Sequence, residues 1–254
     1  MTASDGTRIV WITGAGKGIG RALAKRYAED GWLVAVSART EDDLITLAEQ
    51  ACRNRVKPFP LDVTDAMATL KTFREIEDIL GPLDLAILNA GNYLPMSANT
   101  FSVDRFRDMV ETNLMGTVNG LTPLMETFVA RKSGHIAVVA SLAGYRGLPG
   151  AAAYGATKAA LINMCESLQP DLERYGVKLS LINPGFVETP LTEKNDFPMP
   201  FLIPVETAAT QIVRGLQKSA FETAFPGCFA FLMTLLRFLP DRIFFLLTRR
   251  MLRK

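Results

Sequence analysis

Short apolar runs alternate with longer amphipathic stretches along most of the chain. The runs with the length of a buried strand are Ile9–Ile12, Leu33–Val36, Val56–Pro60, Leu85–Leu88, Ile136–Val139 and Leu179–Ile182. The stretches with a helical period include Glu41–Arg53, Asp65–Leu80, Val103–Ala130 and Ala152–Tyr175. Strands that are continuously apolar are typical of a parallel sheet covered on both faces. The pattern therefore predicts an α/β fold, a doubly wound parallel sheet with helices on both faces.

The length of 254 residues fits one domain of this class, with enough chain to bury a large core. We expect this domain to comprise residues 1–224, with a loop at 186–204 that forms a flap over the substrate. Residues 225–254 are first apolar and then basic, which predicts a C-terminal helical extension. The leader Met1–Thr7 is short and polar, which argues against a signal peptide.

The composition limits the partners and the kinds of site that the chain can have. The net charge of +2 by itself argues neither for nor against nucleic acid, and we expect no nucleic-acid partner. Three unevenly spaced cysteines show no disulfide or zinc pattern, so a reducing cytoplasm is the simplest location. The single histidine, His135, argues against a histidine-based triad and against a multi-histidine metal site. We expect His135 to be structural, because a site needs convergent partners, and we expect no metal.

A glycine-rich segment follows the first apolar run. It is Thr13-Gly14-Ala15-Gly16-Lys17-Gly18-Ile19-Gly20, and a helical stretch from Arg21 to Ala28 comes after it. Glycines let backbone N–H groups approach a pyrophosphate closely, and a helix N-terminus adds a partial positive charge. Such a turn alone is weak evidence, but the strand before it, the helix after it and the second apolar run from Trp32 favour a nucleotide site.

Tyr154 and Lys158 are four residues apart within a helical stretch, and Ser141 precedes them. Positions i and i+4 lie on the same face of a helix, so a phenol and an ammonium group would be side by side. A close cation stabilises the phenolate and lowers its pKa from the usual ~10. The pair would then exchange a proton near neutral pH.

Together these motifs carry a family resemblance. In chain order they are Thr13-Gly14-x-x-x-Gly18-Ile19-Gly20, Asn89-Ala90-Gly91, Asn113, Ser141, Tyr154-x-x-x-Lys158 and Pro184-Gly185. From about residue 8 to about residue 190, the chain resembles the short-chain dehydrogenase/reductase family of the compact, single-domain kind. The resemblance implies a Rossmann-type fold and hydride transfer between a nicotinamide and a carbonyl or secondary alcohol. No expected catalytic position is substituted.

The resemblance also implies four catalytic roles. Tyr154 would give a proton to the developing alkoxide, and Ser141 would hydrogen-bond the substrate oxygen. Lys158 would lower the pKa of Tyr154 and bind the nicotinamide ribose. Asn113 would hold a water molecule that links Lys158 to solvent.

For the cofactor, the resemblance implies a larger set of residues. They are Gly14, Lys17, Gly18, Ile19, Gly20, Arg39, Asp62, Val63, Asn89, Ala90, Gly91, Tyr154, Lys158, Pro184, Gly185, Val187 and Thr189. Asp62 and Val63 would flank the adenine. The segment 89–91 would line the ribose side, and the set from Pro184 to Thr189 would hold the carboxamide.

The end of the second apolar run decides between NAD and NADP. An NAD site usually has an acid there, and by resemblance the position is Ala38, followed by Arg39. Lys17 and Arg39 would bind a 2′-phosphate, which predicts NADP(H) and the reduction of a carbonyl. The alternative is that both cations are merely solvated. The acids at 41–43 are expected in the first turn of a helix capped by Thr40.

The C-terminal apolar residues fall into two groups, 229–239 and 243–247, separated by Pro240-Asp241. Neither group has the length of about 20 residues that spans a bilayer. Residues 237–254 contain six basic residues and one acid, which suits a peripheral contact with a membrane surface. The equal alternative is that this segment packs on the substrate pocket or on a second subunit. Relatives commonly form dimers or tetramers, so we expect a homo-oligomer.

Three functions compete. The leading hypothesis is an NADPH-dependent reductase of an apolar, lipid-like ketone or aldehyde. A non-catalytic NADP(H)-binding scaffold or redox sensor is the second, and the intact Asn113, Ser141, Tyr154 and Lys158 argue against it. The third is a sugar-nucleotide epimerase or dehydratase, for which the chain has no room for a C-terminal substrate domain.

Overall fold

A computed structural model of the chain describes residues 6–194, 197–218 and 220–250. Part of the predicted leader, two residues of the predicted flap (Asn195 and Asp196) and the basic residues Arg253 and Lys254 lie outside the described residues.

Seven strands form one parallel sheet in the order β3-β2-β1-β4-β5-β6-β7. The strands are β1 (Ile9–Thr13), β2 (Leu33–Ser37), β3 (Val56–Pro58), β4 (Leu85–Leu88), β5 (His135–Val139), β6 (Lys178–Pro184) and β7 (Glu222–Phe225). The strand order reverses between β1 and β4, and ligands of such sheets bind in the crevice outside the carboxyl ends of the strands at this point. The predicted doubly wound sheet is confirmed.

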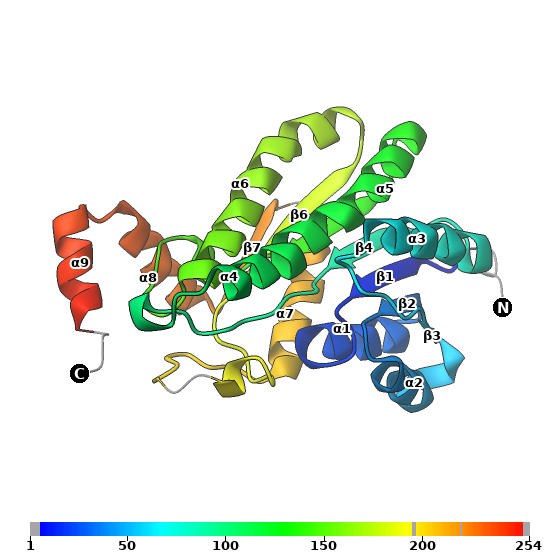
Figure 1. Ribbon diagram of the computed structural model, residues 1–254. Coiled ribbons are helices and arrows are strands. Elements are labelled where there is room, and N and C mark those ends of the chain that lie inside the picture. Colours follow the sequence, from blue (N-terminus) through cyan, green and yellow to red (C-terminus); the bar gives the residue numbers. More distant parts are fainter. Residues whose placement is uncertain (1–5, 195–196, 219, 251–254) are drawn as a thin grey trace.

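The helices cover both faces of this sheet (Figure 1). They are α1 (Gly18–Glu29), α2 (Glu41–Gln50), α3 (Ala66–Leu80), α4 (Val103–Met109), α5 (Gly116–Arg131), α6 (Ala152–Arg174), α7 (Val205–Leu216), α8 (Gly227–Phe238) and α9 (Asp241–Arg249). A π-helical turn, η3 (Val110–Met115), joins α4 to α5. The short 3-10 turns are η1 (Cys52–Asn54), η2 (Ala98–Thr100), η4 (Leu142–Gly144) and η5 (Thr192–Lys194).

Two buried clusters separate the faces. Residues of α3, α5 and α6, such as Phe73, Leu124 and Leu161, pack on one side of the sheet. Residues of α1, α2 and α7 pack on the other, with Leu23 and Ile212 fully buried. The strands therefore have apolar neighbours on both faces, which explains why they are continuously apolar in the sequence.

The structure differs from the predicted elements in three places. The helix predicted at Val103–Ala130 is interrupted by η3, and its apolar period gave no sign of the wider turn. The strand β7 was not predicted, because Glu222, Thr223 and Ala224 give this edge strand little apolar character. The helix α7 was also absent from the predicted elements.

The strand β7 ends at Phe225, so the boundary predicted between residues 224 and 225 falls within the last strand of the sheet. The apolar extension begins at α8, directly after this strand. Figure 1 shows α8 and α9 beyond the β7 end of the molecule, with α9 standing off from the sheet.

Candidate active site

The glycine-rich segment lies between β1 and α1 and is pressed against the end of β4. Gly14 has a φ of +65°, and a Cβ on it would lie 2.7 Å from the Cα of Ala90. A Cβ on Gly20 would lie 2.5 Å from the carbonyl oxygen of Gly14. Both positions therefore require glycine, and the backbone of this segment stays open to a ligand.

Hydrogen bonds tie this segment to β4. The Thr13 hydroxyl oxygen accepts from the backbone N–H groups of Asn89 at 3.0 Å and Ala90 at 3.2 Å. The Asn89 side-chain amide donates to the carbonyl oxygens of Thr13 at 3.0 Å and Gly14 at 3.2 Å. The Asn89 side chain therefore holds the glycine turn in position. This is a structural role in addition to its predicted role of lining the ribose side of the cofactor site.

A cavity of about 400 Å³ opens at this point, where the strand order reverses. Its lining includes a large part of the predicted cofactor site: Gly14, Lys17, Gly18, Ile19, Arg39, Asp62, Val63, Asn89, Ala90, Gly91 and Thr189. The lining residues that the sequence analysis did not assign to the site are Gly16, Ala38, Thr40, Asp43, Leu61, Thr112, Pro190 and Leu191.

The other predicted residues do not line this cavity: Gly20, Asn113, Ser141, Tyr154, Lys158, Pro184, Gly185 and Val187. Gly20 lies against Gly14. Pro184 and Gly185 lie towards α8, where a Cβ on Gly185 would be 2.7 Å from the Phe229 ring. Val187 is buried, and its carbonyl oxygen accepts from the Thr192 hydroxyl at 2.6 Å.

The two predicted phosphate cations have different surroundings. Arg39 is exposed at the cavity, and within the described part of the chain its guanidinium has no hydrogen bond or ion pair. Lys17 has an ion pair with Asp43, with 3.5 Å between Nζ and Oδ2. Asp43 is in the first turn of α2 as predicted, yet it also lines the cavity, and the Thr40 side chain makes no capping hydrogen bond. Thr40 therefore occupies the N-cap position as predicted but without a side-chain hydrogen bond, and the predicted phosphate cation Lys17 has a carboxylate beside it.

Tyr154 and Lys158 are both in the first two turns of α6. The Lys158 Nζ lies 5.6 Å from the centroid of the Tyr154 ring and donates a hydrogen bond to the Val139 carbonyl oxygen at 2.9 Å. The Tyr93 ring packs edge-on against Tyr154, with 5.2 Å between the centroids. The helix thus brings the phenol and the ammonium group together at the carboxyl end of β5.

Ser141 joins them from the turn after β5. It occupies the N-cap of η4, where its Oγ accepts from the Ala143 N–H at 3.1 Å and donates to the Pro184 carbonyl oxygen at 3.3 Å. It also acts on Tyr154, whose pKa it lowers. The Ser141 hydroxyl therefore links the end of β5 to β6 and lies next to α6.

Burial governs the proton affinities of this group. It raises the pKa of Tyr154 to about 12, an effect that the Ser141 hydrogen bond opposes. It lowers the pKa of Lys158 to about 8. The predicted lowering of the Tyr154 pKa by Lys158 is not found in this structure, because the cost of burying a phenolate raises the pKa and Ser141, not Lys158, opposes it.

Asn113 lies in η3 and is fully buried. Its Oδ1 accepts from the Asn92 N–H at 2.6 Å, and its Nδ2 donates to the Asn92 carbonyl oxygen at 2.9 Å and the Thr157 hydroxyl at 3.1 Å. Single-turn π-helices often occur at functional sites. Sequence reasoning missed Asn92 and Thr157, although Thr157 lies at i+3 from Tyr154 and its hydroxyl bonds the Tyr154 carbonyl oxygen at 2.8 Å.

Neither a cluster of metal ligands nor a membrane-spanning helix occurs in residues 6–194, 197–218 and 220–250. In these residues, no group of three or more His, Cys, Asp or Glu side chains is arranged to hold a metal ion. Over the same residues, no helix has both the length and the apolar character needed to cross a bilayer.

His135 is partly buried beside Ser180, with 2.9 Å between Nε2 and Oγ, and burial lowers its pKa to about 3.

Comparison with known proteins agrees with this geometry. A family model described as short chain dehydrogenase matches residues 8–198. An uncharacterized oxidoreductase of Myxococcus xanthus (strain DK1622) is 39% identical over 246 residues, covering 96% of this chain and 97% of the relative. That coverage necessarily extends into α8 and α9, so the extension has a counterpart in this relative.

Solved structures share the fold. A short-chain dehydrogenase/reductase from Burkholderia phymatum in complex with NAD has a TM-score of 0.83 at 22% identity, covering 90% of this chain and 92% of that chain. An alcohol dehydrogenase from Thermococcus sibiricus complexed with 5-hydroxy-NADP has a TM-score of 0.78 at 24% identity, with coverages of 86% and 96%. These neighbours contain either form of the cofactor. By its family match and its relatives, the chain belongs to the short-chain dehydrogenase family of oxidoreductases.

Proposed function

We propose that the protein is an NADP(H)-dependent oxidoreductase that reduces an apolar, lipid-like ketone or aldehyde to an alcohol. The observation that carries this proposal is the convergence of Ser141, Tyr154 and Lys158 beside a cavity whose glycine turn has no room for a side chain. Such a turn fits a pyrophosphate, and the first turn of α1 adds backbone N–H groups to it.

Carbonyl reduction needs a hydride at carbon and a proton at oxygen. The nicotinamide cofactor supplies the hydride when it is bound. The Tyr154 hydroxyl gives the proton, and its raised pKa keeps the phenol in the protonated form that a donor needs. The Ser141 hydroxyl hydrogen-bonds the same oxygen as negative charge develops on it. Lys158 would bind the cofactor ribose, and Asn113 holds the backbone of Asn92 by a hydrogen bond.

The preference for NADP(H) rests on Arg39. Ala38 leaves no carboxylate at the end of β2, so nothing at that position repels a 2′-phosphate. Arg39 is exposed at the cavity and would pair with two phosphate oxygens through its planar guanidinium group. The Asp43 carboxylate offsets the charge of Lys17, so Arg39 is the principal phosphate ligand.

An apolar substrate is supported by aromatic side chains around Pro184 and Gly185. Phe186 and Phe201 each stack on Phe229, with centroid separations of 5.5 Å and 5.9 Å. Phe197 packs against Phe186 at 5.9 Å. A cluster of aromatic side chains of this kind favours ligands that bury apolar surface.

The proposal also gives the protein a location and an assembly. The cysteines Cys52, Cys165 and Cys228 are free thiols, which suits a reducing cytoplasm. We propose a homodimer or homotetramer with a peripheral membrane contact through residues 225–254, whose helices leave large apolar side chains exposed.

The test is a titration of intrinsic fluorescence with NADPH and NADH, repeated on Arg39→Ala. We expect the wild-type protein to prefer NADPH and the variant to lose that preference. Arg74→Ala, an exposed arginine on α3 outside the cavity, is the matched control and should behave as wild type. Equal binding of both cofactors would refute the NADP assignment, and cofactor binding without turnover of any apolar carbonyl compound would favour the non-catalytic scaffold.

A further inference from the structure

The helix α8 has two apolar faces. One contains Phe229, Ala230 and Met233, which are buried in a cluster with Leu142 next to Ser141. The opposite face carries Phe231, Leu235 and Phe238, spaced as i, i+4 and i+7, with exposed fractions of 66%, 50% and 78%. A helix that is apolar all round is normally buried all round. Among the described residues, half of α8 therefore has no apolar partner of the kind that its sequence implies.

The helix α9 also exposes apolar side chains. Ile243, Phe245, Leu246 and Leu247 are 41–56% exposed. Together with Phe231, Leu235 and Phe238 of α8, we call them the outer surface of the extension. Phe244 is buried, with the Arg146 guanidinium over its ring.

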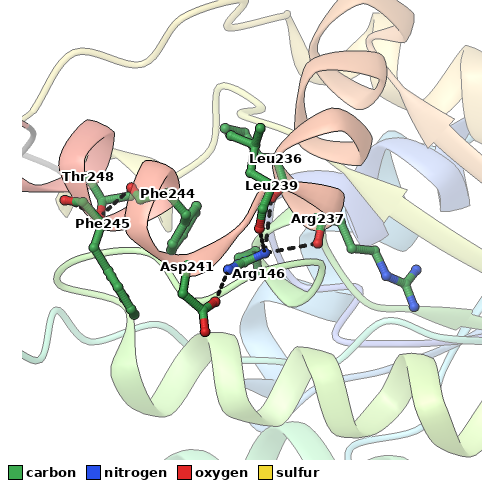
Figure 2. Close-up of polar contacts among 8 residues, drawn as sticks. All are labelled: Arg146, Leu236, Arg237, Leu239, Asp241, Phe244, Phe245 and Thr248. Atoms are coloured by element: carbon green, nitrogen blue, oxygen red, sulfur yellow. Dashed lines mark hydrogen bonds and ion pairs between the residues drawn. The ribbon is translucent and has the colours of Figure 1, made fainter.

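Arg146 fixes the two helices to the catalytic segment (Figure 2). Its guanidinium donates to the carbonyl oxygens of Arg237 at 2.9 Å and Leu239 at 2.8 Å, at the C-terminal end of α8. It also pairs with Asp241 at 2.5 Å and lies over the Phe244 ring at 4.3 Å. The extension is therefore docked on the protein by defined contacts, and its outer surface is presented in a set orientation.

The charge of the extension is positive. Arg242, Arg249 and Arg250 are exposed in or directly after α9. Asp241 is the only acid in the sequence from 227 to 250, and Arg146 already pairs with it. Figure 2 shows the Arg237 side chain directed away from Arg146, and its charge acts on Tyr145, so we do not count it among the cations of the outer surface.

We propose that the outer surface of α8 and α9 docks on an anionic lipid bilayer, with the apolar side chains in the interfacial region and the arginines at the headgroups. Short amphipathic helices with this arrangement lie in the plane of the interface. Each arginine near an anionic surface is attracted to it. This inference rests on the membrane part of the proposed function and names the docking residues and the lipid charge.

A second copy of the chain fits this surface less well. A symmetric pairing through α8 and α9 would bring the arginines of both copies together, and the segment offers no unpaired carboxylate to neutralise them. Like charges facing each other oppose association. An anionic bilayer provides both an apolar layer and negative charge.

The experiment is vesicle flotation of the purified full-length chain. Vesicles of phosphatidylcholine alone are compared with vesicles of phosphatidylcholine and phosphatidylglycerol. We expect flotation with the anionic vesicles, at least a tenfold loss in Phe231→Ser/Leu235→Ser/Phe238→Ser, and a loss of roughly fivefold for each arginine replaced in Arg242→Gln/Arg249→Gln. Met67→Ser, which removes an exposed apolar side chain from α3, and Arg74→Gln should float as wild type.

Flotation is measured without cofactor or substrate, so its failure differs from a failure of the oxidoreductase proposal. NADPH titration of the same variants shows whether each still folds and binds. The inference is overturned if wild type does not float with anionic vesicles, or if the triple variant floats as well as wild type. It is also overturned if the triple substitution converts a dimer to a monomer in solution and wild type does not float with the vesicles, because a second copy then covers the surface.

Discussion

Two regions of the molecule bury their surfaces to different extents: the glycine turn in the middle of the sheet and the extension beyond β7. In the first region, the glycine turn, Thr13 and Asn89 exchange hydrogen bonds at 3.0–3.2 Å, and the backbone packing leaves no room for a Cβ. At the β7 end, α8 and α9 bury one face and leave the other exposed. The first region is packed within the chain except for its cavity, whereas the second has exposed apolar side chains that the proposed bilayer would cover.

The largest effect is expected on catalysis, from a substitution that leaves the packing of both regions unchanged. Tyr154→Phe should reduce kcat for an apolar carbonyl substrate by about 10²- to 10⁴-fold, because the proton donor is lost. Flotation should be unchanged. Steady-state kinetics by cofactor absorbance measures this, with Tyr175→Phe, at the exposed end of α6, as the control. Turnover at the wild-type rate would remove Tyr154 from the mechanism.

The second prediction concerns Lys158, the buried cation close to the cavity. The pKa of Lys158 is about 8 in the folded protein against an ordinary value of 10.5, so the unfolded chain binds more protons between those values. The free energy of unfolding should therefore rise with pH across this window, on the order of 3 kcal/mol in total. Lys158→Met removes this contribution.

Urea unfolding of both proteins across that window measures the difference. The raised pKa of Tyr154 acts in the opposite sense above its unfolded value, and it is common to both proteins. Parallel stability curves for wild type and Lys158→Met would contradict the assignment of a depressed Lys158 pKa.

The third prediction sharpens the contrast in packing. Gly14→Ala should lower the free energy of unfolding by about 1–3 kcal/mol and abolish cofactor binding, because of its positive φ and the contact with Ala90. Gly147→Ala is the matched control, since a Cβ there meets nothing within 4 Å. Thermal unfolding and NADPH titration separate the two. Tolerance of Gly14→Ala would mean that the turn is less tightly packed than described.

The smallest effect is expected on the stability of the extension formed by α8 and α9. Arg146→Lys keeps the charge but loses the fork that reaches two carbonyl oxygens and Asp241, at a cost of about 1 kcal/mol given that Asp241 is 80% exposed. Hydrogen exchange of the α9 amides should become faster while that of the sheet stays unchanged. Exchange unaltered in α9 would show that Phe244 alone docks this helix.

The sequence predicted most of the fold because buried parallel strands and amphipathic helices have distinct periods. It also predicted that Tyr154 and Lys158 share a helix face, since that depends only on local spacing. The pKa of Tyr154 was predicted in the wrong direction, because burial is set by neighbours such as Tyr93 that are distant in the sequence. The Asp43–Lys17 pair and the interactions of Arg146 with α8 and α9 are likewise tertiary contacts that no local pattern encodes.

Arg146 lies in the segment that begins at Ser141, so the proposed docking helices and the proposed substrate-binding hydroxyl are joined in one unit. On a bilayer, such a unit would meet the plane with the same side in every encounter. A lipid-dissolved carbonyl compound would then reach the protein by lateral diffusion, a search in two dimensions. Turnover would depend on the mole fraction of that compound in the membrane, and adding inert lipid would slow the reaction at a constant total amount of substrate.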